Sequence, residues 1–138
     1  MPVTLITGTS RGIGMALADH YLSQGDEVVG FSRGPVGSQS PRYQHHKVDI
    51  SDPDAVVRAL ARHKRIDRLI NNAGIASMNH TLLTPMSTVR DVFATNVFGA
   101  FACVQEAMRK GCTRVVNLST VAVPYSLPGE AAYAASKA

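Results

Sequence analysis

Apolar residues follow two patterns that alternate along the chain. In the first, short runs rich in β-branched and apolar residues predict buried strands. These runs occupy residues 3–7 (VTLIT), 27–32 (EVVGFS), 45–50 (HHKVDI), 68–71 (RLIN) and 113–119 (TRVVNLS). In the second pattern, apolar residues recur every three or four positions, which predicts helices. The helical stretches span residues 13–25, 53–63, 85–110 and 130–138.

The ends of these helices carry their own signals. Gly25 and Gly111 are predicted C-terminal stops, because glycine readily adopts the left-handed conformation that ends a helix. Ser51 or Asp52 is the predicted N-cap of the second helix, with Pro53 in its first turn.

Some interior positions of the helices also carry expectations. Asn96 and Gly99 are expected to weaken or bend the longest helix, since both have low helix propensity. The residues expected to face the core are Ile13, Ala16, Leu17 and Tyr21 in the first helix, and Val57, Leu60 and Ala61 in the second.

The order of the elements predicts the fold class. Strands that alternate with helices favour a parallel sheet with helices on both faces. Residues 33–43 are rich in Gly, Pro and Ser and are predicted to form a loop. No repeat or linker divides the chain, so residues 1–138 are expected to form a single α/β domain.

Composition narrows the class of protein. The chain has 138 residues, of which 45% are hydrophobic and 17% charged, as in an ordinary soluble globule. It contains no run of about 18 apolar residues and no pattern typical of a signal peptide. Cys103 and Cys112 are too far apart for a C-x-x-C motif, which favours two free thiols in a reducing compartment. These features predict a cytoplasmic location and no membrane association.

Charge and histidines give no evidence for nucleic acid or metal. The net charge is +4, and the densest basic run, residues 58–68, contains no aromatic residue that could stack on a base. It is interpreted as the solvated face of an amphipathic helix. His45 and His46 are adjacent on a predicted strand, so their side chains should point to opposite faces. The other three histidines, His20, His63 and His80, are expected to be isolated, and no metal site is predicted.

The first predicted strand runs into a glycine-rich segment, TGTSRGIG, at residues 7–14. Gly8, Gly12 and Gly14 fall at the turn into the helix, where glycines permit tight backbone angles and close approach of a pyrophosphate. The N-terminus of the helix adds free N–H groups and a positive dipole end. The segment lacks the G-K-[S/T] of a P-loop, which disfavours NTP hydrolysis. Taken alone, it is also compatible with a tight turn that binds nothing.

Tyr133 and Lys137 lie one helical turn apart near the end of the chain. A tyrosine hydroxyl ordinarily has a pKa near ~10, and a nearby ammonium favours its ionised form. Such a pair can therefore do acid chemistry.

Five elements occur in a characteristic order: residues 7–14, Asp49, NNAG at 71–74, Asn96, and Ser119 followed by YAASK at 133–137. Together they resemble the short-chain dehydrogenase/reductase family, over the chain from residue 3 to 138. The G-x-x-x-G-x-G spacing resembles the shorter, single-domain subtype of that family. The resemblance implies a Rossmann-like, doubly wound parallel sheet that binds a dinucleotide, and a small carbonyl or alcohol substrate.

The resemblance also implies roles for individual residues. Ser119, Tyr133 and Lys137 would be catalytic: Tyr133 donates a proton to the carbonyl oxygen, Ser119 donates a hydrogen bond to it, and Lys137 also binds the nicotinamide ribose. Asn96 would complete a proton relay by freeing a main-chain carbonyl for a water; the alternative is a simple helix defect. Asp49 would bind the adenine amino group. The residues implied to bind the coenzyme are Gly8, Thr9, Ser10, Arg11, Gly12, Ile13, Gly14, Ser32, Arg33, Asp49, Ile50, Asn72, Ala73, Gly74, Tyr133 and Lys137.

The end of the second predicted strand discriminates between coenzymes. An acidic residue there would bind the ribose 2′-hydroxyl of NAD, but this chain has Ser32 followed by Arg33. Arg11 supplies a second cation, and two guanidinium groups beside a hydroxyl suit a 2′-phosphate. The sequence therefore favours NADP(H) over NAD(H). The alternative is a pair of exposed arginines on a basic protein.

In the family the chain continues beyond the Tyr-x-x-x-Lys helix, so the domain is expected to be incomplete at its C-terminus, with later strands missing. Two functions remain open: an NADP(H)-dependent oxidoreductase that interconverts a carbonyl and a secondary alcohol, or a catalytically impaired nucleotide-binding remnant. The last helix is expected to fray because it is short. The fifth strand would be an exposed edge that promotes self-association, so a homo-oligomer, dimer or tetramer, is expected.

Overall fold

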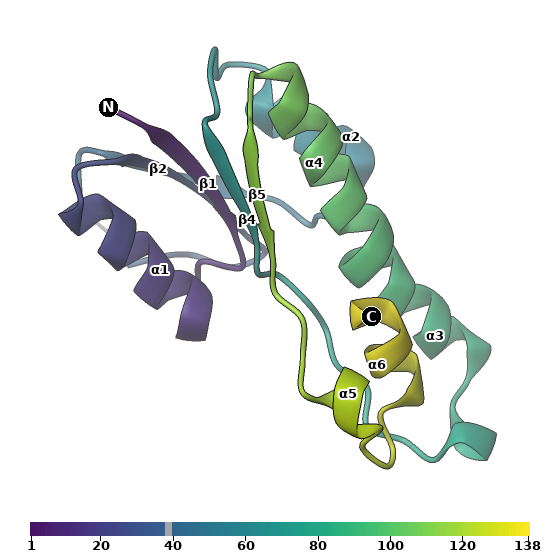
Figure 1. Ribbon diagram of the computed structural model, residues 1–138. Helices are drawn as coiled ribbons and strands as arrows, with labels where there is room; N and C mark the ends of the chain where they lie inside the picture. Colours follow the sequence, from purple (N-terminus) through teal and green to yellow (C-terminus); the bar gives the residue numbers. More distant parts are fainter. Residues whose placement is uncertain (38–39) are drawn as a thin grey trace.

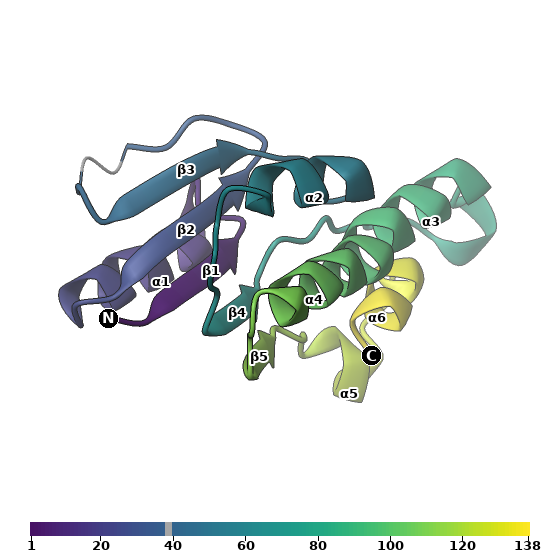
Figure 2. The same cartoon turned by 90° about the horizontal axis from the view of Figure 1, so that it is seen from above.

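A five-stranded parallel sheet in the order β3-β2-β1-β4-β5 forms the centre of the molecule (Figures 1 and 2). The computed structural model describes residues 1–37 and 40–138. The strands are β1 (Val3–Thr7), β2 (Glu27–Ser32), β3 (Tyr43–Lys47), β4 (Arg68–Asn71) and β5 (Arg114–Asn117). The helices are α1 (Gly12–Ser23), α2 (Pro53–Leu60), η1 (Thr81–Leu83), α3 (Met86–Phe93), η2 (Ala94–Gly99), α4 (Ala100–Arg109), α5 (Ala122–Tyr125) and α6 (Ala131–Lys137).

Helices cover both faces of the sheet, with α1 on one side and α2 and α4 on the other (Figure 2). Successive residues of the central strands point to opposite faces and enter separate cores. The core beneath α2 and α4 includes Leu5, Val29 and Leu69, whereas the core beneath α1 includes Ile6, Val28 and Ile70. The pattern's prediction of a parallel sheet with helices on both faces is therefore confirmed, and the chain has the Rossmann-like, doubly wound α/β fold that the resemblance implied.

The bounds of three strands, β1, β2 and β4, agree with the prediction. The third strand was placed too late: it spans Tyr43–Lys47 rather than 45–50. Its pairing with β2 runs from Val28 opposite Tyr43 to Ser32 opposite Lys47, and the ladder ends where β2 ends. Of the loop predicted over 33–43, residues 33–37 and 40–42 contain no helix or strand, whereas Ser38 and Gln39 lie outside the described residues.

The inward face of α1 differs from the prediction at two positions, whereas Leu17 and Tyr21 pack against the core as predicted. Gly14, Ala18 and Leu22 are buried, whereas Ile13 and Ala16 are exposed. The turn before the helix sets its rotation, because Gly14 packs directly on the carbonyl of Gly8.

The inward face of α2 is also rotated. Val56 and Leu60 are buried at four-residue spacing, whereas Val57 and Ala61 are exposed, so the prediction holds only for Leu60. As expected, Asp52 caps this helix: its Oδ1 accepts hydrogen bonds from the amides of Asp54 and Ala55 at 3.1 and 3.3 Å.

The predicted long helix is continuous but contains a π-helical turn, η2, between α3 and α4. The turn holds both residues that were expected to disturb the helix, Asn96 and Gly99, and both are buried. Gly111 ends the helix with φ +86°, and Gly25 ends α1 with φ +96°, as predicted. The short helix α5 was not expected, since its sequence, AVPY, carries no helical periodicity.

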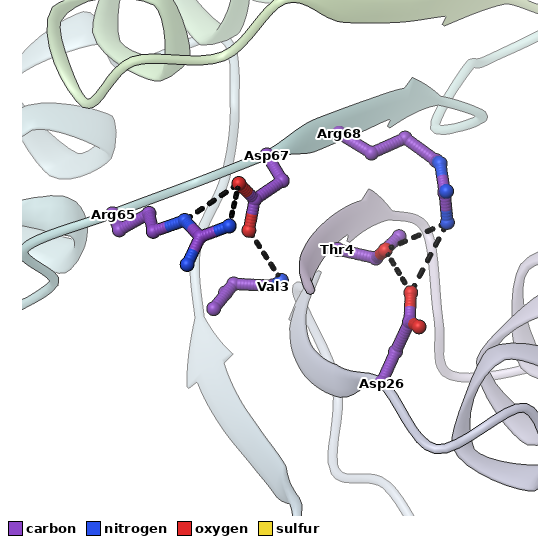
Figure 3. A network of polar contacts seen from close by, with 6 residues as sticks. All are labelled: Val3, Thr4, Asp26, Arg65, Asp67 and Arg68. Atoms are coloured by element: carbon purple, nitrogen blue, oxygen red, sulfur yellow. Dashed lines mark hydrogen bonds and ion pairs between the residues drawn. The ribbon is translucent and has the colours of Figure 1, made fainter. Parts of the chain in front are cut away.

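The amino ends of β1 and β4 are joined by two groups of polar contacts (Figure 3). Asp26 Oδ2 accepts hydrogen bonds from Thr4 Oγ1 at 2.6 Å and from Arg68 Nη1 at 3.1 Å. Asp67 accepts from the amide of Val3 at 2.8 Å and from Arg65 Nε at 2.6 Å. These contacts lie at the end of the sheet opposite the glycine-rich turn, so they stabilise the fold away from the candidate site.

Two expectations about cysteines and histidines can be compared with the structure. Cys103 and Cys112 are free thiols, as predicted, and both are buried. His63, by contrast, is not isolated: its Nε2 lies 2.9 Å from Nε2 of His46. Residues 1–37 and 40–138 contain no cluster of three metal-ligating side chains. In the same residues, no helix is long and apolar enough to cross a membrane.

Candidate functional site

The turn between β1 and α1 depends on its glycines for different reasons. Gly8 and Gly12 have φ values of +76° and +57°, in the region that favours glycine. At Gly14 the requirement is space, since a Cβ would lie 2.0 Å from the Gly8 carbonyl oxygen. The G-x-x-x-G-x-G spacing therefore brings the start of α1 into close contact with the end of β1.

The N-terminus of α1 is free to bind an anion. Arg11 is the N-cap residue, and its side chain makes no capping hydrogen bond. The first turn also contains no acidic residue, so its unpaired N–H groups and positive dipole end are not neutralised.

A cavity of about 490 Å³ opens beside this helix end. It lies at the carboxyl ends of β1, β2 and β4. The strand order reverses at this point, since β2 and β3 lie on one side of β1 and β4 and β5 on the other, and sheets of this kind bind ligands there. The predicted residues that line it are Gly8, Ser10, Arg11, Gly12, Ile13, Ser32, Arg33, Asp49, Ile50, Asn72, Ala73 and Gly74.

Other residues of the predicted set lie elsewhere. Thr9 and Gly14 are buried in the wall behind the cavity, and Tyr133 and Lys137 do not line it. The sequence reasoning missed five lining residues, each of which is adjacent in the chain to a predicted one. These are Phe31, Gly34, Val48, Ile75 and Thr95.

Asn72 fixes the floor of the cavity. Its Nδ2 donates to the carbonyls of Thr7 and Gly8 at 3.0 and 3.2 Å, and its amide donates to Thr7 Oγ1 at 3.0 Å. The amide of Ala73 donates to the same hydroxyl at 2.9 Å. The NNAG segment therefore joins the end of β4 to the glycine-rich turn, as an element that shapes a phosphate site should.

Ser32 and Arg33 lie at one end of the cavity. Ser32 is buried and donates to the carbonyl of Gly34 at 2.8 Å, whereas Arg33 and Arg11 are exposed. Asp49 supplies a carboxylate in the same lining. The Ser51 hydroxyl, which donates to Asp49 Oδ1 at 2.7 Å, and the charge of Arg33 hold the Asp49 pKa below its usual value. Asp49 therefore remains an acceptor at neutral pH.

Asn96 connects three segments from the π-helical turn. Its Oδ1 accepts from the amide of Ile75 at 2.9 Å, and its Nδ2 donates to the Ile75 carbonyl at 2.8 Å and to Ser136 Oγ at 2.9 Å. The Asn96 side chain thus holds the loop after NNAG and helix α6 together.

Lys137 reaches from α6 to the wall of the cavity beside α1. Its Nζ donates to the Leu118 carbonyl at 3.3 Å. A Cβ on Gly74 would lie 3.1 Å from that Nζ and 3.2 Å from Asn96 Oδ1, so the absence of a side chain at Gly74 gives the ammonium its place. Burial lowers the pKa of Lys137.

Ser119 bonds directly to Lys137, whereas Tyr133 is bonded to Ser136, the residue before Lys137. Ser119 Oγ donates to the main-chain carbonyl of Lys137 at 2.9 Å, and the Tyr133 carbonyl accepts from Ser136 Oγ at 2.7 Å. Ser119, Asn96 and Lys137 line a second hollow of about 420 Å³, whereas Tyr133 does not. The structure thus brings Asn96, Ser119 and Lys137 together, with Tyr133 one turn away on α6.

The fold and the glycine-lined cavity define a Rossmann-like α/β protein of the nucleotide-binding type. Comparison with known proteins identifies the family: the model for short chain dehydrogenase matches residues 2–138. The chain belongs to the short-chain dehydrogenase family.

Curated relatives and solved structures agree with this assignment. The chain is 29% identical to the 3-oxoacyl-[acyl-carrier-protein] reductase FabG of Salmonella typhimurium, covering 99% of this chain and 62% of that protein. It is 33% identical to NADPH-dependent aldehyde reductase 2 of Arabidopsis thaliana, covering 99% and 61%. A short chain dehydrogenase from Burkholderia cenocepacia, solved in complex with NADP, superposes with a TM-score of 0.90 at 28% identity, covering 99% and 60%. The chain thus spans about 62% of the length of the first of these curated relatives.

Proposed function

We propose that the protein binds NADP(H) and, with Asn96, Ser119, Tyr133 and Lys137, interconverts a small carbonyl compound and a secondary alcohol. The observation that supports this most strongly is the composition of the cavity beside α1. Its lining combines an uncapped helix N-terminus with Arg11 and Arg33, and the residue at the end of β2 is Ser32 rather than a carboxylate. Anionic phosphates at both places would be stabilised by free N–H groups and guanidinium groups.

The coenzyme fits the residues that are present. Gly14 lets α1 start against Gly8, and Asn72 holds that turn, so the N-terminus of α1 lies at the cavity lining. When bound, NADPH supplies the hydride. Arg11 and Arg33 would hold the 2′-phosphate, and Asp49, ionised at neutral pH, would accept a hydrogen bond from the adenine amino group.

The catalytic residues act on the substrate oxygen in this proposal. Tyr133 holds the proton that the oxygen receives, and Ser119 donates a hydrogen bond to it. Lys137 supplies a partly buried ammonium, whose field is weakly screened. Asn96 positions α6 through Ser136, and so sets where Tyr133 and Lys137 lie.

Two relatives support the coenzyme and substrate class: one is by name an NADPH-dependent aldehyde reductase and another a 3-oxoacyl reductase. From the composition, the free cysteines and the exposed edge strand, we also propose a cytoplasmic homo-oligomer that uses a small-molecule substrate and contacts neither nucleic acid nor membrane.

A nucleotide-binding protein without turnover is the second candidate. It is favoured by the Ser119 hydroxyl, which donates to the Lys137 carbonyl rather than facing Tyr133. A purified chain mixed with NADPH and a panel of small ketones and aldehydes distinguishes the two. Loss of NADPH absorbance that Tyr133→Phe abolishes supports the oxidoreductase, whereas binding without oxidation supports the second candidate.

A further inference from the structure

A chain of hydrogen bonds runs behind the cavity from the glycine-rich turn to the end of β2. Thr9 Oγ1 and the Tyr43 hydroxyl are 2.9 Å apart, and the Tyr43 hydroxyl lies 3.1 Å from His45 Nδ1. His45 Nε2 in turn lies 3.0 Å from the Gly34 carbonyl and 3.2 Å from Ser32 Oγ. Tyr43 and His45 belong to β3, and none of the motif residues named above lies in that strand. The motifs therefore do not predict these contacts.

The direction of each bond follows from the last acceptor. The Gly34 carbonyl can only accept, so His45 Nε2 carries a hydrogen and Nδ1 of the neutral ring is an acceptor. The Tyr43 hydroxyl then donates to Nδ1, and Thr9 donates to Tyr43. Burial raises the pKa of Tyr43, which keeps its hydroxyl protonated and able to donate.

The surrounding structure is shaped to hold this chain. A Cβ on Gly30 of β2 would lie 2.0 Å from the Tyr43 hydroxyl oxygen and 2.7 Å from Thr9 Oγ1. Gly30 therefore leaves the space in which the two hydroxyls meet. Thr9 is fully buried, and the rings of Tyr43 and His45 stack with an interplanar angle of 17°.

We propose that Tyr43 and His45 are positioning residues that hold the Ser32–Gly34 turn in the shape required for a 2′-phosphate and couple that turn to Thr9. The inference rests on the proposed NADP(H) function. Neither residue touches the coenzyme in this scheme. Both act through the turn that carries Arg33, and so they determine coenzyme preference rather than general affinity.

The test compares the affinities of four variants for NADPH and NADH. His45→Leu removes the contacts of both ring nitrogens, Tyr43→Phe removes the hydroxyl, and His45→Gln restores a donor near Gly34. His46→Leu is the matched control, because His46 is the neighbouring histidine on the opposite face of β3. Thermal unfolding of each variant shows whether it is folded.

His45→Leu and Tyr43→Phe are expected to weaken NADPH binding by about five- to tenfold, the effect of one or two lost hydrogen bonds, and NADH binding by less than about twofold. His45→Gln should recover most of the ratio, and His46→Leu should leave it unchanged. Equal losses for both coenzymes, or a ratio that moves as much in His46→Leu, would overturn the inference while leaving the proposed function intact.

A wild-type protein that binds both coenzymes equally would instead contradict the proposed coenzyme preference, and the 2′-phosphate role would fall with it. The contacts themselves are then tested by ¹⁵N NMR of the histidine rings. A His45 tautomer protonated at Nε2, altered by Tyr43→Phe, supports the hydrogen-bond chain; a His45 signal unaffected by that substitution overturns it.

Discussion

Asn96 Nδ2 donates a hydrogen bond to Ser136 Oγ at 2.9 Å, although the two residues are 40 positions apart in the chain. Both side chains are buried, and Ser136 also donates to the carbonyl of Tyr133. The contact therefore ties helix α6, which carries Tyr133 and Lys137, to the π-helical turn within the long helix.

The first prediction concerns this contact. Asn96→Ala removes three hydrogen bonds and leaves the partly buried amide and carbonyl of Ile75 without these partners, so it should lower the free energy of unfolding by about 2–3 kcal/mol. Ser136→Ala should cost about 1 kcal/mol. Urea denaturation measures both, and equal effects of the two substitutions would show that the Ile75 contacts contribute nothing.

The second prediction concerns the ion pair at the other end of the sheet. Arg68→Ala should lower the free energy of unfolding by about 2–3 kcal/mol, because it takes one of the two side-chain partners that the described residues give the buried Asp26 carboxylate and removes the guanidinium stacked on Tyr21. Arg65→Ala, which breaks a more exposed pair with Asp67, should cost less than about 1 kcal/mol. A larger loss in Arg65→Ala by the same denaturation measurement would contradict this account.

The third prediction is a pH dependence of stability. Burial lowers the pKa of both His46 and His63 from the usual 6.5, and their mutual hydrogen bond cannot form when both rings are protonated. The unfolded chain then binds protons more readily than the folded one, so this contribution is fully present above pH 6.5 and is lost as the pH falls through the lowered values. The melting temperature should drop more steeply between about pH 6.5 and 5 in the wild type than in the double variant His46→Gln/His63→Gln. Parallel curves for the two proteins would rule the pair out as the cause.

The fourth prediction concerns the coenzyme. Ser32→Asp places a carboxylate beside Arg33 at the end of β2, where it should repel a 2′-phosphate and accept a hydrogen bond from a 2′-hydroxyl. The ratio of the NADPH to the NADH dissociation constant should rise by at least about tenfold, from preference for NADPH toward preference for NADH. Ser32→Asn, similar in size but neutral, is the control and should shift the ratio less. Equal wild-type affinities would refute the premise.

The fifth prediction is self-association through β5. All four residues of this strand are exposed, and Val115 and Val116 retain 39% and 47% of their accessible surface. An edge strand with exposed apolar residues pairs readily with another chain. Light scattering should therefore detect dimers or larger species that Val116→Lys reduces. A monomer at high concentration in the wild type would be inconsistent with this.

Hydrophobic runs were sufficient to predict much of the fold. β1, β2 and β4 were predicted with the correct bounds because their apolar residues are consecutive and bounded by turn residues. β3 was misplaced because its inner residues include Tyr43 and His45, whose polar atoms are satisfied by partners in other segments. The rotation of α2 was misjudged because local spacing does not reveal which side of a helix faces the sheet.

The candidate site was predicted from motifs, so the prediction did not include contacts that lie outside them. The glycine-rich turn, NNAG and the Ser32–Arg33 pair do line one cavity. The contact between His46 and His63, and the one between Thr9 and Tyr43, depend on the register of β3 and on where α2 ends. No local pattern encodes those distances, which arise only when the strands are paired.

The π-helical turn also determines how α4 is rotated relative to α3 within the long helix. A π turn contains an extra residue relative to an α-helix, and one residue corresponds to a rotation of about 100°. Deleting a residue between Ala94 and Gly99 would restore a regular helix, but would rotate α4 against α3 by that angle. Cys103 and Ala107, which pack on the sheet, and Asn96, which faces α6, could then no longer be directed inward together. In this short stretch the length of the chain, and not only its sequence, is therefore constrained.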